Sequence, residues 1–269
     1  MAAMRSKVQA IYSLEQLSAG ETFIHNVHPL VKMLTTLLYI FCVISFDRYT
    51  LSALVPYVFY PIVIIALAEV PYGMILRRML LALPFCLLIG LSNVFFDTDS
   101  AVHIGTFAVS YGVVSFFALL FRTALCVLAV LVLVAVTPFR DITGQLRRLR
   151  VPDMLVSLFE MTYRYIGTLL DETSSMYTAY RLRSRTGKGL EMRDMGSFVG
   201  QLLIRSFGRA ERVYGAMKCR GYPSDRKYMT NRAMSRTDWY FLVLVCGVAL
   251  LFRFVNIPIA FARWLGGLI

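Results

Sequence analysis

Two arginines, Arg183 and Arg220, each end a basic segment with helical periodicity, and each is followed by a small residue. The short motifs around them are Leu182-Arg183-Ser184 and Cys219-Arg220-Gly221. A cation at the C-terminus of a helix complements the negative end of the helix dipole, which is the purely structural interpretation. A guanidinium can also bind a carboxylate or backbone carbonyls with several donors at once, and a small neighbour lets a partner surface approach. Because the arrangement occurs twice in one basic region, we favour two partner-binding sites.

Other residues with possible chemistry give weaker signals. His25 and His28 have a spacing that could ligate a metal on a helix, but no third ligand accompanies them, and we interpret them as a feature of the membrane interface. Asp171-Glu172 is the one adjacent pair of acids in the basic region. The segment Thr186–Gly189 lacks the upstream glycine and the following hydroxyl of a nucleotide-binding loop. We therefore expect no metal, no cofactor and no catalytic residues in this chain.

One arginine and most of the cysteines lie in apolar sequence. Arg122 is inside an apolar run, where a charge is a functional candidate by default, and we favour pairing within the helix bundle or contact with the outer interface. The five cysteines are far apart and form no CxxC pair, which is typical of small buried apolar residues and not of a disulfide framework or a zinc site. They are Cys42, Cys86, Cys126, Cys219 and Cys246.

The composition of the chain indicates that apolar helices position the residues described above. The 269-residue chain is 58% hydrophobic and 16% charged, whereas a soluble domain has about a quarter charged residues. A bilayer needs roughly 20 apolar residues per helical span, and continuous rather than alternating apolar runs indicate helices and not a barrel. The sequence thus predicts an all-α integral membrane protein with about five transmembrane helices. Their ranges are about 30–46, 51–68, 79–96, 113–136 and 239–255.

The distribution of basic residues predicts the orientation in a cell (inner) membrane. The loop at 97–112 has no Lys or Arg, which places it outside, with Arg77-Arg78 and the N-terminus in the cytoplasm. Lys32, at the start of the first span, is expected to reach the headgroups through its long stem. Because the first residues lack a long apolar stretch followed by small residues, we expect no cleaved signal peptide.

A basic region of about a hundred residues separates the fourth and fifth spans. Residues 138–238 hold nineteen of the 28 Lys and Arg but ten of the 16 Asp and Glu. Such a region suits anionic headgroups or an acidic protein surface, and no aromatic platform favours nucleic acid. The expected domains are 1–137 (N-terminal tail and first four spans), 138–238 (cytoplasmic domain) and 239–269 (last span and tail).

Two long amphipathic helices are predicted inside this region. Apolar and small residues recur at steps of three and four from Leu155 to Tyr180 and again from Val199 to Met217. A polar, glycine-containing turn separates them. Gly221 fits a left-handed position just after the second helix, and Pro223 prevents its continuation. We expect the two helices to cross or pair through their apolar stripes, with the arginine-bearing ends projecting.

The arginine motifs resemble a known family. The segment SFGRAERVYGAMKCRGYP is similar to the second signature, Ala-Met-x-Ala-Arg-Gly, of the transmembrane T subunit of energy-coupling factor (ECF) transporters, and YTAYRLRS resembles the first. Leu182 and Cys219 stand where the family has alanine, and Arg181, Arg183 and Arg185 alternate, which leaves the register of the first motif open. The stretches IHNVHPLVKMLTTLLYI and LRRLRVPDMLVSLFEMTYRYI look most like the cobalt branch, the CbiQ type.

The resemblance implies a function and a set of partners. It implies a non-catalytic subunit that bridges two cytoplasmic ABC-type ATPases and a small substrate-binding membrane subunit. Because the resemblance is closest to the cobalt branch, the implied substrate is cobalt. Its two coupling helices would insert Arg183 and Arg220, with their neighbours Leu182, Ser184, Cys219 and Gly221, into grooves of the ATPases. Such coupling requires contacts whose energy differs between the ATPase states.

Two other classes of function stay open from the residues alone. One is a membrane-embedded enzyme that holds a phosphorylated lipid or prenyl substrate on the basic region. Such an enzyme needs a carboxylate cluster for Mg²⁺, for which Asp171-Glu172 is the candidate. The other is a scaffold whose basic domain lies on anionic headgroups of the lipid bilayer.

Overall fold

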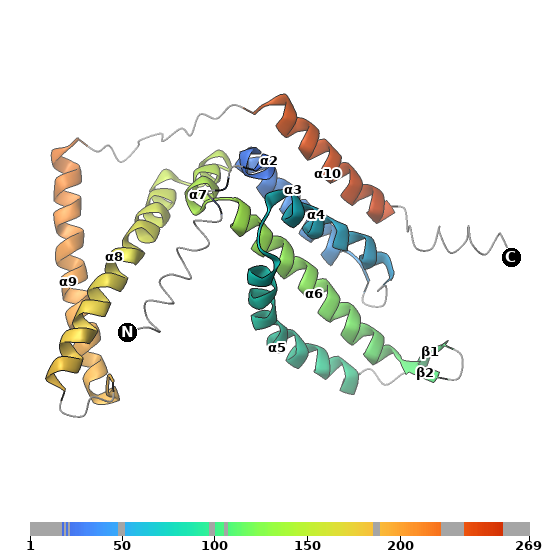
Figure 1. The fold of residues 1–269 in the computed structure, drawn as a ribbon, viewed down its shortest axis with the longest axis horizontal. Helices are drawn as coiled ribbons and strands as arrows, with labels where there is room; N and C mark the ends of the chain where they lie inside the picture. The colour runs from blue at the N-terminus through green and yellow to red at the C-terminus, as the bar shows by residue number, and fades with distance from the viewer. Residues whose placement is uncertain are drawn as a thin grey trace. The chain divides into compact units, whose positions relative to one another are not determined.

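The computed structural model describes residues 18, 20, 22–47, 52–96, 100–104, 107–184, 189–221 and 234–254. These residues fall into two compact units (Figure 1). We call the described residues from Thr143 to Gly221 the hairpin unit. We call those up to Ile142 and from Met234 onward the bundle unit.

The bundle unit consists mainly of helices that pack side by side. Helix α6 contacts α3, α4 and α5, and α10 lies against α3 (Figure 1). The elements are α2 (Phe23–Asn26), α3 (Pro29–Ile44), the 3₁₀ helix η1 (Ser52–Val58), α4 (Phe59–Ala68), α5 (Tyr72–Phe96), β1 (Ser100–Ile104), β2 (Phe107–Ser110), α6 (Tyr111–Val136) and α10 (Arg236–Phe254).

Three further helices follow α6 and precede α10. Helix α7 (Phe139–Arg148) carries the chain from the bundle unit into the hairpin unit, whose main elements are α8 (Asp153–Arg183) and α9 (Met192–Cys219). Pro152 is the N-cap of α8, where its missing N–H costs nothing. Helix α8 begins and ends close to the predicted residues, and α9 ends close to them but begins at Met192, seven residues before Val199 and inside the segment predicted as a turn.

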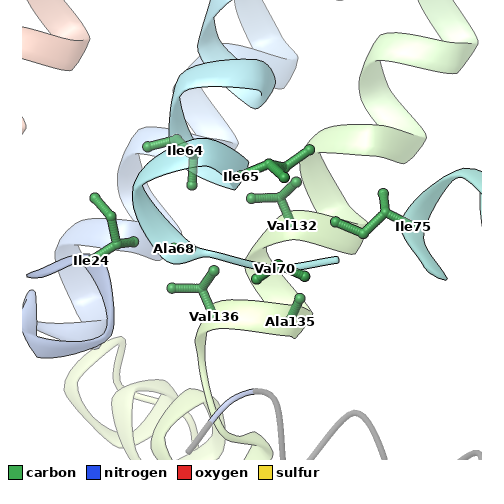
Figure 2. Close-up of a cluster of buried hydrophobic side chains, with 9 residues drawn as sticks. All are labelled: Ile24, Ile64, Ile65, Ala68, Val70, Ile75, Val132, Ala135 and Val136. Atoms are coloured by element: carbon green, nitrogen blue, oxygen red, sulfur yellow. The ribbon is translucent and has the colours of Figure 1, made fainter. Parts of the chain in front are cut away.

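Two clusters of buried apolar side chains hold the bundle unit together. One cluster lies between α4 and α6, and α2, the start of α5 and the connection between α4 and α5 add side chains to it (Figure 2). Its members are Ile24, Ile64, Ile65, Ala68, Val70, Ile75, Val132, Ala135 and Val136. The other cluster joins α3, η1 and α6 and is richer in aromatic rings. Its members are Tyr39, Cys42, Val43, Phe46, Ala53, Leu54, Tyr57, Leu125 and Ala129.

The fold is mainly helical, as predicted, and the loop predicted at 97–112 contains one short pair of strands. Strands β1 and β2 pair antiparallel, with His103 opposite Ala108 and Ile104 opposite Phe107. Two short segments with β-branched residues on either side of a turn satisfy each other's backbone groups, and helical periodicity gives no sign of this.

Each of the five ranges predicted as spans is helical over nearly all of its described residues; α3 ends two residues before the first range does, and η1 occupies the first part of the second range. Proline 56 lies within η1, where the tighter 3₁₀ turn replaces a regular helix. Among the described helices, Gly112–Val136 is long and apolar enough to cross a membrane, and Pro29–Ile44 and Ala53–Ala68 are shorter apolar helices. The number of spans stays a prediction.

Lys32 and Arg122 link the antiparallel helices α3 and α6 at both ends. Lys32 does not reach outward as expected; its side chain is buried, and Nζ donates to the carbonyl of Val136 at the end of α6 (3.1 Å). Arg122 of α6 donates to the carbonyls of Phe46 and Asp47 (2.9 Å for Asp47), just after the end of α3. Lys32 thus places a cation at the C-terminus of α6, where the helix dipole favours positive charge, whereas Arg122 binds carbonyls of the segment that follows α3.

Candidate functional site

Helices α8 and α9 form an antiparallel hairpin in which both arginine motifs are found. Near the connection, the Tyr180 hydroxyl donates to Asp194 Oδ2 (2.7 Å). Farther from it, Glu172 pairs with Arg205 (2.6 Å) and Arg209 (3.5 Å). Later residues of α8 thus pair with earlier residues of α9, as an antiparallel arrangement requires. Polar side chains, and not a buried apolar seam alone, set the register of the hairpin.

The first arginine tip, Leu182–Ser184, lies at the connection of the hairpin. Arg183 is the last residue of α8 and is exposed, and the side chain of Leu182 is 83% exposed. The backbone turns to an extended conformation at Ser184, whose N–H donates to the carbonyl of Tyr180 (2.9 Å). The helix therefore stops cleanly, and both large side chains of this tip are accessible to a partner.

The second arginine tip, Cys219–Gly221, follows the last turn of α9. Arg220 is the C-cap, and its N–H donates to the carbonyls of Ala216 and Met217 (3.2 Å each). Gly221 adopts a left-handed conformation with φ of +61°, and its N–H donates to the Lys218 carbonyl (3.0 Å). All three residues of the tip are exposed, and Cys219 is a free thiol. The expected left-handed glycine is confirmed, and only glycine adopts this conformation without steric cost.

The hairpin does not bring the two tips together. The first tip lies where α8 ends, next to the start of α9, and the second tip lies at the far end of α9 (Figure 1). A helix of 28 residues is about 42 Å long, because each residue adds about 1.5 Å. The two arginines therefore cannot act on one small ligand. They present two separate contact points on one rod-like element.

The apolar side chains of α9 are only partly covered. On one line along the helix the side chains are half-buried, namely Leu202, Ser206, Val213 and Met217, and α9 has no fully buried residue. A second line at helical spacing is exposed, and we call it the α9 apolar stripe. It consists of Met192, Met195, Val199, Leu203, Phe207 and Tyr214. The expectation that the two helices pair through their apolar stripes is thus met on one side of α9 and leaves the other side accessible.

An ion network that periodicity does not reveal fixes the bend between α7 and α8. The side chain of Arg147 is 11% exposed and lies 3.4 Å from carboxylate oxygens of both Asp153 and Glu160. Arg150, in the connection, has a left-handed φ of 63°. A largely buried guanidinium held by two carboxylates resists bending at this point. The sequence signal that could have revealed it is Arg147 near two acids on the first turns of α8.

The remaining candidate residues have structural contacts of their own. His25 Nδ1 lies 2.6 Å from Thr22 Oγ1, whereas His28 Nδ1 accepts from Leu30 N, so the two imidazoles do not face one ligand. Glu172 is engaged by Arg205 and Arg209. Within the described ranges, no group of three or more His, Cys, Asp or Glu side chains is arranged to hold a metal ion. The carboxylate of Glu172 is thus an ion-pairing element of the hairpin.

Comparison with known proteins places these features in a family. Residues 20–230 match the family model CbiQ, described as cobalt transport protein. The chain is 27% identical over 252 residues to the energy-coupling factor transporter transmembrane protein EcfT of Limosilactobacillus fermentum, covering 86% of this chain and 92% of that protein.

Two further relatives, matched over shorter stretches, have names that mention a metal. The chain is 28% identical over 120 residues to the cobalt transport protein CbiQ of Rhodobacter capsulatus (44% of this chain, 49% of that protein). It is 29% identical over 103 residues to the nickel permease LarQ of Lactiplantibacillus plantarum (38% and 37%). The chain thus spans about half or less of the length of these two relatives. Since the family model covers most of the chain, the chain belongs to the CbiQ/EcfT family, the transmembrane T subunits of energy-coupling factor transporters.

Proposed function

We propose that this chain is the coupling subunit of an ATP-driven importer and passes movements of two partner ATPases to a substrate-binding membrane subunit. Subunits of this family are non-catalytic components of transporters. The observation that carries the proposal is the pair of exposed arginine tips at opposite ends of one hairpin. Two separate contact points suit two ATPase subunits better than they suit one small ligand.

The tips suit contacts with acidic or carbonyl-lined grooves. Arg183 and Arg220 are both exposed, and Ser184 and Gly221 beside them add little bulk. A guanidinium that becomes buried against a carboxylate forms a strong contact, whose loss costs a few kcal/mol. Since closure of the ATPases on ATP would change such contacts, the hairpin would move with the ATPase cycle. Leu182 and Cys219 are the apolar members of the same proposed sites.

The bundle unit is proposed to lie in the cell membrane with five spans. Helix α6 has the required length and composition, and large apolar side chains are exposed on the outer faces of α3, α4 and α5. Soluble proteins rarely leave such extensive apolar surface in water. The N-terminus and the domain at 138–238 are placed in the cytoplasm, between the spans in 1–137 and the last span in 239–269.

The substrate is proposed to be Co²⁺, with Ni²⁺ as the alternative. The family description and one relative name cobalt, and another relative names nickel. The metal would be held by the substrate-binding membrane subunit. The α9 apolar stripe is the surface of the hairpin unit best suited to contact that apolar partner, because its large side chains are already exposed.

The experiment reverses the charge of each tip and compares it with a matched change elsewhere. Arg183→Glu and Arg220→Glu are expected to reduce co-purification of the ATPases and to abolish uptake of radioactive Co²⁺ when combined. The controls are Arg164→Glu on α8 and Arg212→Glu on α9, which are also exposed and change net charge equally. Immunoblots of membranes check that all variants insert.

The result distinguishes the proposal from a lipid-binding scaffold. If the control substitutions weaken activity as much as the tips do, total charge is what matters and a headgroup-binding role replaces coupling. Unchanged uptake in the Arg183→Glu/Arg220→Glu double variant would refute the proposed sites.

A further inference from the structure

Two of the places where the chain enters or leaves the bundle unit lie beside the first turn of α3 (His28–Lys32). The outgoing connection follows α6, which ends at Val136, and α7 begins after only Thr137 and Pro138. The returning connection leads into α10, which begins at Arg236. Two buried polar side chains, Lys32 and Asp238, join these two helix ends to α3.

Lys32 holds the outgoing connection. Its side chain is 5% exposed, and Nζ donates to the carbonyls of Val136 and His25 (3.1 Å each). Val136 is the last residue of α6, so its carbonyl has no partner within that helix. An ammonium group donating to such a carbonyl forms a charge-assisted hydrogen bond at the negative end of the helix dipole.

Asp238 holds the returning connection. It is 4% exposed and lies in the first turn of α10. Its Oδ1 accepts from the backbone N–H of His28 (2.9 Å), and its Oδ2 accepts from Ser235 N (2.9 Å). His28 is the buried N-cap of α3. One carboxylate thus binds the N-terminal ends of α3 and α10 together, where the positive ends of two helix dipoles favour it.

These contacts differ from the apolar packing around them. Burial of apolar surface has no preferred direction, so it does not select one relative position of two groups as a hydrogen bond does. A buried charged group that loses its hydrogen bond is left without water, which makes displacement costly. The last turn of α6 and the first turns of α3 and α10 are therefore held as one block.

We propose that Lys32 and Asp238 are positioning residues that carry movement of the hairpin unit into the transmembrane helices. The inference rests on the proposed function, since it assigns the place where coupling enters the bundle. Force on the outgoing connection reaches α6 and, through Lys32, α3. Movement that reaches the start of α10 passes, through Asp238, to the same turn of α3. Displacements of the end of α6 and of the start of α10 thus act on one point of α3.

The test uses the complex purified from native membranes through a tag on this chain and reconstituted into vesicles. Lys32→Met keeps the length of the side chain but removes the charge and donors, and Asp238→Asn keeps its shape but removes one acceptor. We expect the Co²⁺ taken up per ATP hydrolysed to fall about fivefold or more in each variant, in the range typical of coupling between sites. Lys32→Arg is expected to restore the ratio in part.

Arg122→Met is the matched control. Arg122 also joins α6 to α3 through a cation and backbone carbonyls, but at the opposite end of α3, where it contacts Phe46 and Asp47. It is expected to lower thermal stability and to leave the ratio of uptake to hydrolysis unchanged. A merely structural role for Lys32 would lower uptake and hydrolysis together, as in this control.

The outcomes separate this inference from the proposed function. If the tagged wild-type chain retrieves no ATPase, the proposed function fails before the positioning residues are tested. If the wild-type complex couples and Lys32→Met and Asp238→Asn couple equally well, the positioning role alone is refuted. If Lys32→Met does not accumulate in the membrane, the result for Asp238→Asn decides whether the positioning role stands. If Arg122→Met lowers the ratio of uptake to hydrolysis as much as the other variants do, the positioning role is also refuted.

Discussion

Glu172 of α8 and Arg205 of α9 are joined by an ion pair in which Oε1 lies 2.6 Å from Nη1. The same carboxylate also binds Arg209, so one acid of α8 is shared by two successive turns of α9. The pair lies between the two arginine tips along the hairpin. It holds α8 and α9 in register between the two proposed ATPase contacts.

Glu172→Ala should loosen the hairpin without unfolding it. Arg205 is 58% and Glu172 24% exposed, so solvent screens the pair, and we expect a loss of about 0.5–1 kcal/mol in the free energy of local opening. Hydrogen exchange of the α9 amides measures that opening. The control is Glu211→Ala, which removes an exposed acid of α9 itself. Equal exchange in both variants would mean that the ion pair contributes nothing.

The two arginine tips should contribute independently to ATPase binding. They lie at opposite ends of α9, and substitutions farther apart than about 10 Å usually have additive effects within about 0.5 kcal/mol. The free-energy losses of Arg183→Ala and Arg220→Ala, measured from binding of the isolated ATPases, should therefore sum to the loss of the double variant. A large non-additive term would instead indicate one shared binding site.

The Tyr180–Asp194 hydrogen bond should make the hairpin sensitive to alkaline pH. Donation of this hydrogen bond to the Asp194 carboxylate raises the pKa of Tyr180. The neutral hydroxyl is therefore favoured in the folded hairpin. The stabilisation of the folded hairpin by this hydrogen bond is complete below the ordinary tyrosine pKa of about 10. It is lost as the pH rises through the raised pKa of Tyr180. Wild type should be more stable than Tyr180→Phe at about pH 8, and the difference should shrink above about pH 10. A constant difference across this range would contradict the assignment.

Gly90 should not tolerate a side chain. A Cβ at this position of α5 would lie 2.7 Å from Cδ2 of Phe116 on α6, which is too close without movement of the ring. Gly90→Ala is expected to cost about 1–3 kcal/mol in thermal unfolding of the detergent-purified protein, as overpacking usually does. Phe116→Leu in the same chain should recover part of the loss. Gly247→Ala, with open space around it in α10, should not destabilise the protein, and a comparable loss there would contradict overpacking at Gly90 as the cause.

The sequence reveals those features of the fold that depend on local patterns. The start of α3 at Pro29 and the left-handed Gly221 follow from preferences of single residues at helix ends. The length of α8 and the end of α9 follow from apolar periodicity. Each is determined by residues within a few turns of one another.

Features that depend on distant partners were missed. Lys32 contacts a carbonyl 104 residues later in the chain, so its buried role has no local sign, and a snorkelling side chain was the natural expectation. The position of the two arginine motifs at opposite ends of the hairpin also needed the three-dimensional arrangement. Their roles as partner contacts stay a prediction, because exposed guanidinium groups suit a partner but do not name it.

The contact of Arg122 with the carbonyls of Phe46 and Asp47 has a consequence for biogenesis. A guanidinium entering lipid alone within α6 would be expensive, because nothing there replaces its hydration. Its acceptors belong to a segment synthesised about 75 residues earlier, which is in place when Arg122 leaves the ribosome. The order of translation thus supplies the acceptor before the donor, and α6 should integrate efficiently only when α3 is already in the bilayer.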